Sequence, residues 1–191
     1  MSTERSASER SASERSLLDA AATLLERGGL AAVTTRAVLA EAGLTAPTLY
    51  HHFGDKDGLL AALLQEGVYD FFAHKDTTLW ITSDPRADLL TAFDSFLDFV
   101  SQQPRLFQLL AVRALDDPAL LGAAVEWCRE RVGQLEREGR LTVDAPMAVQ
   151  SLMAVSNGVA MLRAQGASDA DVRRVGHMIY EQTLSAIVRA P

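Results

Sequence analysis

The stretch from Thr45 to His52 combines hydroxyl, phenol and imidazole side chains with a proline and contains no carboxylate. Threonine hydroxyls can reach base edges or phosphates, and a proline ring suits a thymine methyl group. Tyrosine and histidine can donate hydrogen bonds to phosphate oxygens. This composition predicts a surface for duplex DNA, formed by Thr45, Ala46, Pro47, Thr48, Tyr50, His51 and His52.

Two of these assignments have alternatives. Thr45 and Thr48 can each cap a helix instead of contacting a base. His52 lies four residues after Thr48, so both side chains share one helix face. Leu49 and Phe53 are also four apart, and we expect them to face inward and hold the helix on its neighbours.

Helix start and stop signals place this stretch on the second of two short helices. Thr34 is an expected N-cap for a helix over 35–42, and Gly43 can take the left-handed conformation that ends it. A second helix over 46–53 follows, with Pro47 in its first turn and Gly54 after its end. This arrangement predicts a helix-turn-helix, whose second helix enters the DNA major groove.

Cationic residues begin the two helices that flank this second helix. Arg36 stands beside Thr35 at one start, and Lys56 follows the expected cap Asp55 at the other. Free amides and a positive charge together suit a phosphate. A solvated charge is the alternative, but two such residues on either side of one helix favour phosphate contacts, so Thr35, Arg36 and Lys56 join the predicted DNA surface.

The segment resembles the DNA-binding domain of the tetracycline-repressor (TetR) family of bacterial regulators over about the first third of the chain. The matching residues are Leu17-Leu18-x-Ala20-Ala21-x-x-Leu24, Gly29, Thr34-Thr35-Arg36, Ala42-Gly43-Leu44, Pro47-Thr48-Leu49-Tyr50-x-His52-Phe53 and Lys56-x-x-Leu59-Leu60. The resemblance implies a cytoplasmic bacterial homodimer that binds a palindromic operator. It also implies a C-terminal domain for a small effector and for dimerisation.

Composition favours a helical protein without membrane spans. Of 191 residues, 48% are hydrophobic and 23% charged, and Ala and Leu dominate. No Val/Ile/Thr alternation indicates a sheet, no apolar stretch approaches a membrane span, and the N-terminus lacks a hydrophobic signal segment. Cys128 is the only cysteine. We interpret it as a small buried hydrophobe rather than a redox sensor.

The net charge of −7 argues against strong DNA binding. Residues 1–60 contain six Lys and Arg against eight Asp and Glu, whereas most DNA-binding domains are basic. Affinity would then depend on a dimer that doubles a few phosphate contacts, and would fall steeply with salt. The acidic balance leaves one alternative function open, a small-molecule-binding helical dimer without DNA-binding activity.

We divide the chain into a polar N-terminal arm at 1–15, a helix-turn-helix domain at 16–60 and a ligand-binding and dimerisation domain at 61–191. The arm holds a repeated Ser-Ala-Ser-Glu-Arg pentad. Each Arg follows a Glu, which cancels the positive field, so we favour a solvated tail over an arm that contacts DNA.

The predicted fold is all-α, with three helices in the N-terminal domain and about six after it. The first helix runs to about Arg27 and ends at Gly28-Gly29. Later cap and proline signals predict helices over about 56–75, 85–103, 104–114, 118–138, 146–166 and 169–190. The expected N-caps among them include Asp84, Asp117, Asp144 and Ser168.

The last two long helices are the expected dimer interface. Their spaced small and apolar residues could equally pack inside one chain, and the family resemblance favours the dimer. The predicted interface residues are Ala148, Ser151, Val155, Gly158, Leu162, Val172, Val175, Ile179, Thr183 and Ala186.

Aromatic and methionine side chains in the C-terminal domain could line an apolar effector site. An amide on an apolar stripe is unusual, so Asn157 is our candidate for orienting the effector, with a bond to a neighbouring helix or across the dimer as its alternative. The predicted effector-binding residues are Phe93, Phe96, Phe99, Phe107, Trp127, Met153, Asn157 and Met161.

These residues predict a dimeric, ligand-responsive transcriptional regulator, most simply a repressor released from its operator by a small apolar or aromatic effector. We find no HExxH, GxSxG, phosphate-binding glycine loop, CxxC or spaced His/Asp/Glu cluster. The sequence therefore predicts no enzyme, no cofactor and no metal site.

Overall fold

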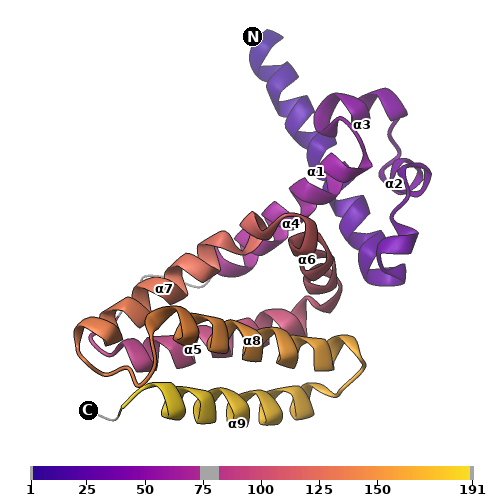
Figure 1. Cartoon of the computed structure of the whole chain (residues 1–191). Helices are drawn as coiled ribbons and strands as arrows, with labels where there is room; N and C mark the ends of the chain where they lie inside the picture. Colours follow the sequence, from indigo (N-terminus) through magenta and orange to yellow (C-terminus); the bar gives the residue numbers. More distant parts are fainter. Residues whose placement is uncertain (1, 74–81, 190–191) are drawn as a thin grey trace. The chain divides into compact units, whose positions relative to one another are not determined.

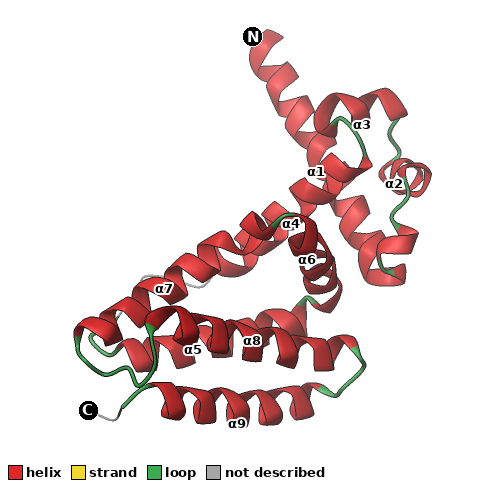
Figure 2. Cartoon of the chain, viewed as in Figure 1, coloured by secondary structure: helices red, strands yellow, loops and turns green. Residues whose placement is uncertain are grey.

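The computed structural model describes residues 2–73 and 82–189, which fall into two compact units, Met1–Phe72 and Ala73–Pro191 (Figure 1). Throughout the described residues the regular elements are helices, and extended pairing is limited to an isolated bridge between Leu141 and Val188 (Figure 2). Within the described residues, the predicted all-α fold with three helices followed by six is confirmed.

Unit 1 holds the predicted helix-turn-helix. Its elements are α1 (Ser2–Gly28), the short 3-10 helix η1 (Leu30–Ala32), α2 (Thr35–Ala42), α3 (Ala46–Phe53) and α4 (Lys56–Ala73). The Ala37 amide donates to the Thr34 hydroxyl at 3.2 Å, and Gly43 ends α2 with φ of 65°. Because the left-handed backbone conformation carries little steric strain for glycine, Gly43 can turn the chain directly toward α3.

The core of unit 1 lies behind α3. Helix α1 packs on both α2 and α3, and α2 packs on α3. The fully or nearly fully buried side chains here include Leu17, Ala21, Leu25, Val38 and Leu49. Leu17, Ala21 and Leu25 recur on α1 at helical spacing, so one side of this helix faces the core.

The pentad repeat is part of α1, which begins at Ser2. The side chains of Glu14, Arg15 and Ser16 are exposed, and the Ser16 hydroxyl donates to the Ala12 carbonyl at 3.0 Å. The predicted arm is therefore a helical continuation of the first helix.

Unit 2 contains α5 (Pro85–Gln102), α6 (Pro104–Asp116), η3 (Pro118–Leu121), α7 (Gly122–Arg137), α8 (Ala145–Ala164) and α9 (Asp169–Ile187). The predicted caps form: Asp84, Asp117, Asp144 and Ser168 each accept a backbone N–H of the first turn. The prediction of one helix over 118–138 is wrong, because Asp117-Pro118 opens a 3-10 turn and α7 begins only at Gly122. The predicted helix ends at Lys75 and Ala190 lie outside the described residues.

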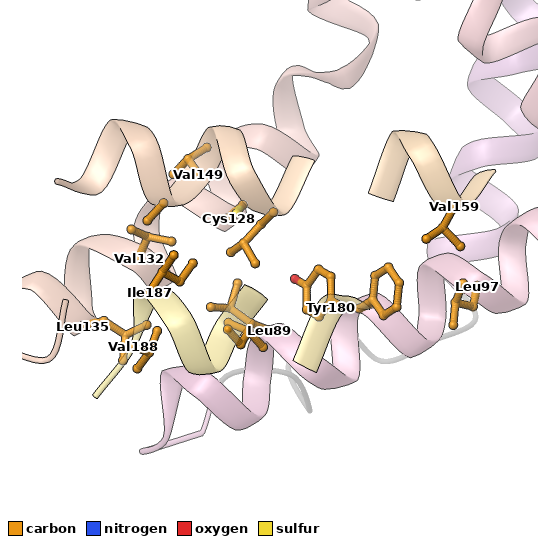
Figure 3. Close-up of a cluster of buried hydrophobic side chains, with 14 of the residues drawn as sticks. Leu89, Leu97, Cys128, Val132, Leu135, Val149, Val159, Tyr180, Ile187 and Val188 are labelled. Atoms are coloured by element: carbon orange, nitrogen blue, oxygen red, sulfur yellow. The ribbon is translucent and has the colours of Figure 1, made fainter. Parts of the chain in front are cut away.

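Four helices build the core of unit 2 (Figure 3). Helix α9 buries Val172, Gly176, Tyr180, Leu184 and Ile187, which follow one another at helical spacing. An added Cβ on Gly176 would lie 3.0 Å from Val159 of α8 and 3.3 Å from both Leu97 and Phe93 of α5. Glycine at this position therefore lets α9 approach both helices closely.

Cys128 of α7 belongs to this core and is 6% exposed. Burial raises the pKa of the Cys128 thiol to about 11, against a smaller opposing effect of the Arg129 charge. The thiolate is the reactive form of cysteine. A thiol that stays protonated at neutral pH fits the interpretation of Cys128 as a small hydrophobe.

Asp88 of α5 is a buried carboxylate, 1% exposed, that holds the chain just before the helix. It accepts hydrogen bonds from the Thr82 amide at 3.0 Å and from the Thr82 hydroxyl at 2.7 Å. The Arg131 guanidinium of α7 lies 3.5 Å away and supplies the opposite charge. We call these three residues the Asp88 clasp.

Helices α8 and α9 lie side by side as an antiparallel hairpin (Figure 1). Backbone hydrogen bonds join its open end: Thr142 N–H donates to the Ile187 carbonyl at 3.0 Å, and Arg189 N–H donates to the Arg140 carbonyl at 2.7 Å. By length and composition α8 is apolar enough to cross a membrane, with a mean hydropathy of 1.2, and only 28% of that apolar window is buried within the chain. An apolar helix with this much free surface is also what an interface between two chains requires.

Candidate nucleic-acid interface

Helix α3 presents the predicted contact residues outward while one leucine anchors it. Leu49 is 0% exposed, whereas Tyr50 is 54% exposed. Pro47 and His51 are also exposed, and Thr48 and His52 are half-buried. No carboxylate lies on this helix. The exposed surface of α3 can therefore approach a polyanion without repulsion from its own side chains.

Thr45 and Thr48 form a hydroxyl pair at the N-terminal end of α3. The two Oγ1 atoms lie 3.2 Å apart, and either oxygen can be the donor. Thr45 occupies the N-cap position, but its side chain accepts no hydrogen bond from the helix backbone. The alternative role of Thr45 as a side-chain cap is therefore wrong, and its hydroxyl remains on the exposed surface.

The starts of α2 and α4 differ in what they can offer a phosphate. Arg36 is exposed in the first turn of α2 and has no ion-pair partner among the residues described, and Thr35 beside it is half-buried. At α4 the Asp55 carboxylate accepts the Gly58 amide at 2.8 Å, so an anion already occupies that helix start. Lys56 is half-buried between Asp55 and Asp57 in the sequence. Arg36 is thus the better placed phosphate ligand of the two.

The last turn of α3 carries two imidazole rings. His51 and His52 contact edge to face with ring centroids 5.4 Å apart, and His52 lies 6.0 Å from the Phe53 ring. Ala46 is half-buried at the first helical position. His51 is free to extend toward a ligand, whereas His52 is partly held against the helical core.

The predicted effector residues separate into six buried or half-buried apolar side chains and two exposed residues. Phe107 of α6 contacts Phe96 and Phe99 at centroid distances of 5.8 and 6.3 Å, and Phe96 stacks on Phe93 at 6.1 Å. Trp127 and Met153 are half-buried against the same core. These six residues are brought together by α5, α6, α7 and α8.

Asn157 and Met161 do not join that group. Asn157 is exposed, and Met161 is 56% exposed. The prediction that Asn157 orients an effector inside an apolar pocket is therefore wrong for this structure, because the face of α8 that carries it points away from the core. Its alternative, a contact with another chain, stays open.

The structure divides the predicted dimer residues in the same way. Ala148 and Val172 are both 0% exposed within their own chain, so they have no surface left to give a partner, and their assignment to the interface is wrong. Ser151, Val155, Leu162, Val175, Ile179 and Thr183 are half-buried, and Gly158 and Ala186 are exposed. These eight residues remain available to a second chain.

Two residues near these sites were missed from the sequence. Tyr180 stacks on Phe93 with centroids 3.9 Å apart and planes within 8°, and burial raises the pKa of its hydroxyl. The signal was the four-residue spacing of Val172, Gly176, Tyr180 and Leu184. Gly58 was also missed: an added Cβ would lie 2.0 Å from the Phe53 carbonyl oxygen, so glycine is needed where α4 leaves α3.

Comparisons with known proteins agree with the helix-turn-helix and with the whole fold. The family described as "Bacterial regulatory proteins, tetR family" matches residues 17–63. The class A tetracycline repressor protein from transposon 1721 of Escherichia coli is 28% identical over 179 residues, 91% of this chain and 76% of the repressor. The transcriptional repressor KstR2 of Rhodococcus jostii is 37% identical over 73 residues, but the match spans only 36% of KstR2 and 38% of this chain.

Solved structures extend the similarity over the C-terminal unit. SmeT, the repressor of the Stenotrophomonas maltophilia multidrug efflux pump SmeDEF, in its complex with triclosan matches with a TM-score of 0.71 and 23% identity, over 93% of this chain and 92% of SmeT. An identity this low supports the fold alone. Together, these comparisons show that residues 17–63 match the tetR family of bacterial regulatory proteins and that the helical architecture of the whole chain is similar to that of a solved repressor.

Proposed function

We propose that the protein is a homodimeric repressor that binds a palindromic operator through α3 and leaves it when a small apolar or aromatic effector occupies unit 2. The exposed, carboxylate-free surface of α3, held by the buried Leu49, is the observation that carries the DNA part of this proposal. The repressors named among its relatives support it.

The DNA contacts divide by chemistry into positioning and reading. Arg36, Tyr50 and His51 present cationic or O–H and N–H groups suited to phosphate oxygens, which fix register but carry no sequence information. Thr45, Pro47 and Thr48 present hydroxyls and an apolar ring suited to base edges. Thr35, Ala46, His52 and Lys56 lie beside them and complete the proposed surface.

Replacing Tyr50 by alanine is expected to weaken DNA binding about tenfold, whatever the sequence, because a hydrogen bond to a charged phosphate is lost. The probe is a duplex selected from a random library by the wild-type protein, with affinity measured by fluorescence anisotropy.

For Arg36→Ala, the slope of log K against log salt should fall by about 0.9 for each phosphate contact removed. Arg105→Ala, at an exposed arginine of unit 2, is the control and should leave both quantities unchanged.

The same experiment separates the two candidate functions. Failure of the wild-type protein to select any duplex, together with no retention on bulk DNA at low salt, would favour the alternative suggested by the acidic net charge. That alternative is a small-molecule-binding dimer without DNA-binding activity. Selection of an inverted repeat supports a two-fold dimer with one α3 in each half-site.

The dimer is proposed to form through the free faces of α8 and α9. Every exposed residue of α8 is uncharged: Pro146, Met147, Gln150, Ala154, Asn157, Gly158, Met161 and Ala164. On α9 the adjoining face carries Val175, Met178, Ile179 and Ala186. A helix face without charge and with small residues permits close approach of a symmetry-related copy.

Ala154→Glu is expected to convert the dimer to a monomer, because two like charges would meet or be buried unpaired at the centre of the face. Size-exclusion chromatography with light scattering measures the mass. Ala124→Glu, at an exposed position of α7, is the matched control and should remain dimeric. A dimeric Ala154→Glu protein would place the interface elsewhere.

The effector is proposed to bind against Phe96, Phe107, Trp127 and Met153, which are half-buried apolar side chains of unit 2. The SmeT complex with triclosan supports an apolar aromatic ligand in this fold. A ligand releases the operator only if it binds the released conformation more tightly, and by linkage DNA then weakens the ligand. A thermal-shift screen of apolar aromatic compounds tests for it, since a ligand of the folded state raises Tm.

A further inference from the structure

The hydroxyl pair of Thr45 and Thr48 has a fixed hydrogen-bonding capacity that follows from its two protons. Each hydroxyl owns one proton, and one of the two lies between the oxygens in the 3.2 Å hydrogen bond. The other proton is free to point outward. The oxygen that gives its proton to the pair keeps lone pairs that can accept. The exposed side of the pair therefore offers one donor next to one acceptor.

The helix holds the pair in this arrangement. The Thr48 amide donates to the Thr45 carbonyl at 3.1 Å, which ties the two residues through the backbone as well. The Thr45 hydroxyl accepts no hydrogen bond from the α3 backbone, so no backbone amide competes with Thr48 for it. Pro47 between them has no N–H, so it cannot offer a donor of its own.

A donor next to an acceptor matches one base edge of the major groove. Adenine presents N7 as an acceptor beside the N6 amino donor. Guanine presents two acceptors, N7 and O6, and would need two outward donors, which the pair can supply only by breaking its own hydrogen bond. Cytosine and thymine each present one polar group there, so they leave half of the pair unused.

We propose that Thr45 and Thr48 act as one unit that reads adenine in each operator half-site and rejects guanine, in the way that a single asparagine amide does. This inference rests on the proposed function, because it requires α3 to lie in the major groove. It names adenine as the base that the pair selects. It also predicts that the losses of affinity caused by removing the two hydroxyls are not additive.

The test uses the duplex selected by wild-type protein and two modified bases. 7-Deazaadenine lacks the N7 acceptor, and purine lacks the N6 amino group. Each is placed in turn at every adenine of the half-site, and affinity is measured by fluorescence anisotropy. At one adenine per half-site, either analogue or a change to guanine should weaken wild-type binding roughly tenfold, within the range of a bidentate contact.

Matched protein variants show whether the pair is responsible. Thr45→Val and Thr48→Val keep the shape and remove one hydroxyl each, and each should cost about as much as the modified base. With either variant one of the two modified bases should have no further effect, and the double variant should lose less affinity than the sum of the two single losses. Thr45→Ser and Thr48→Ser keep the hydroxyls and should retain the adenine preference, which separates base reading from a structural role.

The outcomes are distinguishable. If wild type selects a duplex but the valine variants weaken binding additively, or if no adenine depends on them, the hydroxyl pair does not read adenine and the proposed function still stands. If wild type selects no duplex at all, the proposed function fails first. Thermal unfolding of the valine variants close to wild type excludes a folding defect as the cause.

Discussion

The Asp88→Ala protein is expected to lose about 3–5 kcal/mol of unfolding free energy, the cost of breaking a buried ion pair by removing one partner. Asp88 is 1% exposed and accepts hydrogen bonds from the amide and hydroxyl of Thr82. Alanine would leave the Arg131 guanidinium, whose side chain is only 12% exposed, without its counter-charge. Urea unfolding followed by circular dichroism measures the loss.

Two matched variants define the origin of that loss. Asp94→Ala removes an exposed carboxylate of the same helix, 3.3 Å from His177, and should change stability by less than about 1 kcal/mol. Asp88→Asn keeps an oxygen that can accept from Thr82 but loses the charge, so its stability should fall between wild type and Asp88→Ala. Equal losses for Asp88→Ala and Asp94→Ala would contradict a structural role for the clasp.

Gly58→Ala is expected to cost about 3 kcal/mol, at the upper end of overpacking effects. The added Cβ would lie 2.0 Å from the carbonyl oxygen of Phe53 and 3.1 Å from its carbonyl carbon. These are backbone atoms, which cannot swing aside as a side chain can. The start of α4 would have to move, and the Asp55 cap at 2.8 Å and the buried Leu59 would move with it.

The readouts for Gly58→Ala are thermal unfolding and affinity for the selected duplex. Both should fall together, because the junction positions the end of α3. Gly133→Ala is the control: its Cβ would meet only the Arg137 guanidinium at 3.6 Å, an ordinary contact. Alanine in a helix interior is favoured over glycine by about 1 kcal/mol, so this variant should be at least as stable as wild type. A stable Gly58→Ala protein with intact DNA affinity would show that α4 relaxes freely.

Local signals were sufficient to predict the helix-turn-helix. The bounds of α2 and α3 match the structure because Thr34, Gly43 and Gly54 each act on their immediate neighbours. The caps at Asp84, Asp144 and Ser168 were predictable for the same reason. Thr45 was not, because capping and pairing with Thr48 use the same hydroxyl and only the side-chain rotamer decides between them.

Features that depend on distant partners were not predictable. Asp88 looks like an ordinary acidic residue in the first turn of a helix, and its partner Arg131 lies 43 residues further along the chain. Asn157 reads as an interior amide, yet α8 turns that side outward. Ala148 and Val172 were assigned to the dimer interface for the same reason, because the sequence does not show which apolar face of a helix is buried within its own chain. Periodicity predicts that a helix has a buried face, whereas the choice between neighbouring faces is made by packing.

The bridge between Leu141 and Val188 joins the segment before α8 to the residue after α9, so the two helices are connected at both ends. The chain turns from α8 into α9 at one end, and hydrogen bonds fasten Arg140 and Thr142 to Arg189 and Ile187 at the other. Connections at both ends oppose sliding of one helix along the other. We therefore expect α8 and α9 to move together in any rearrangement of unit 2.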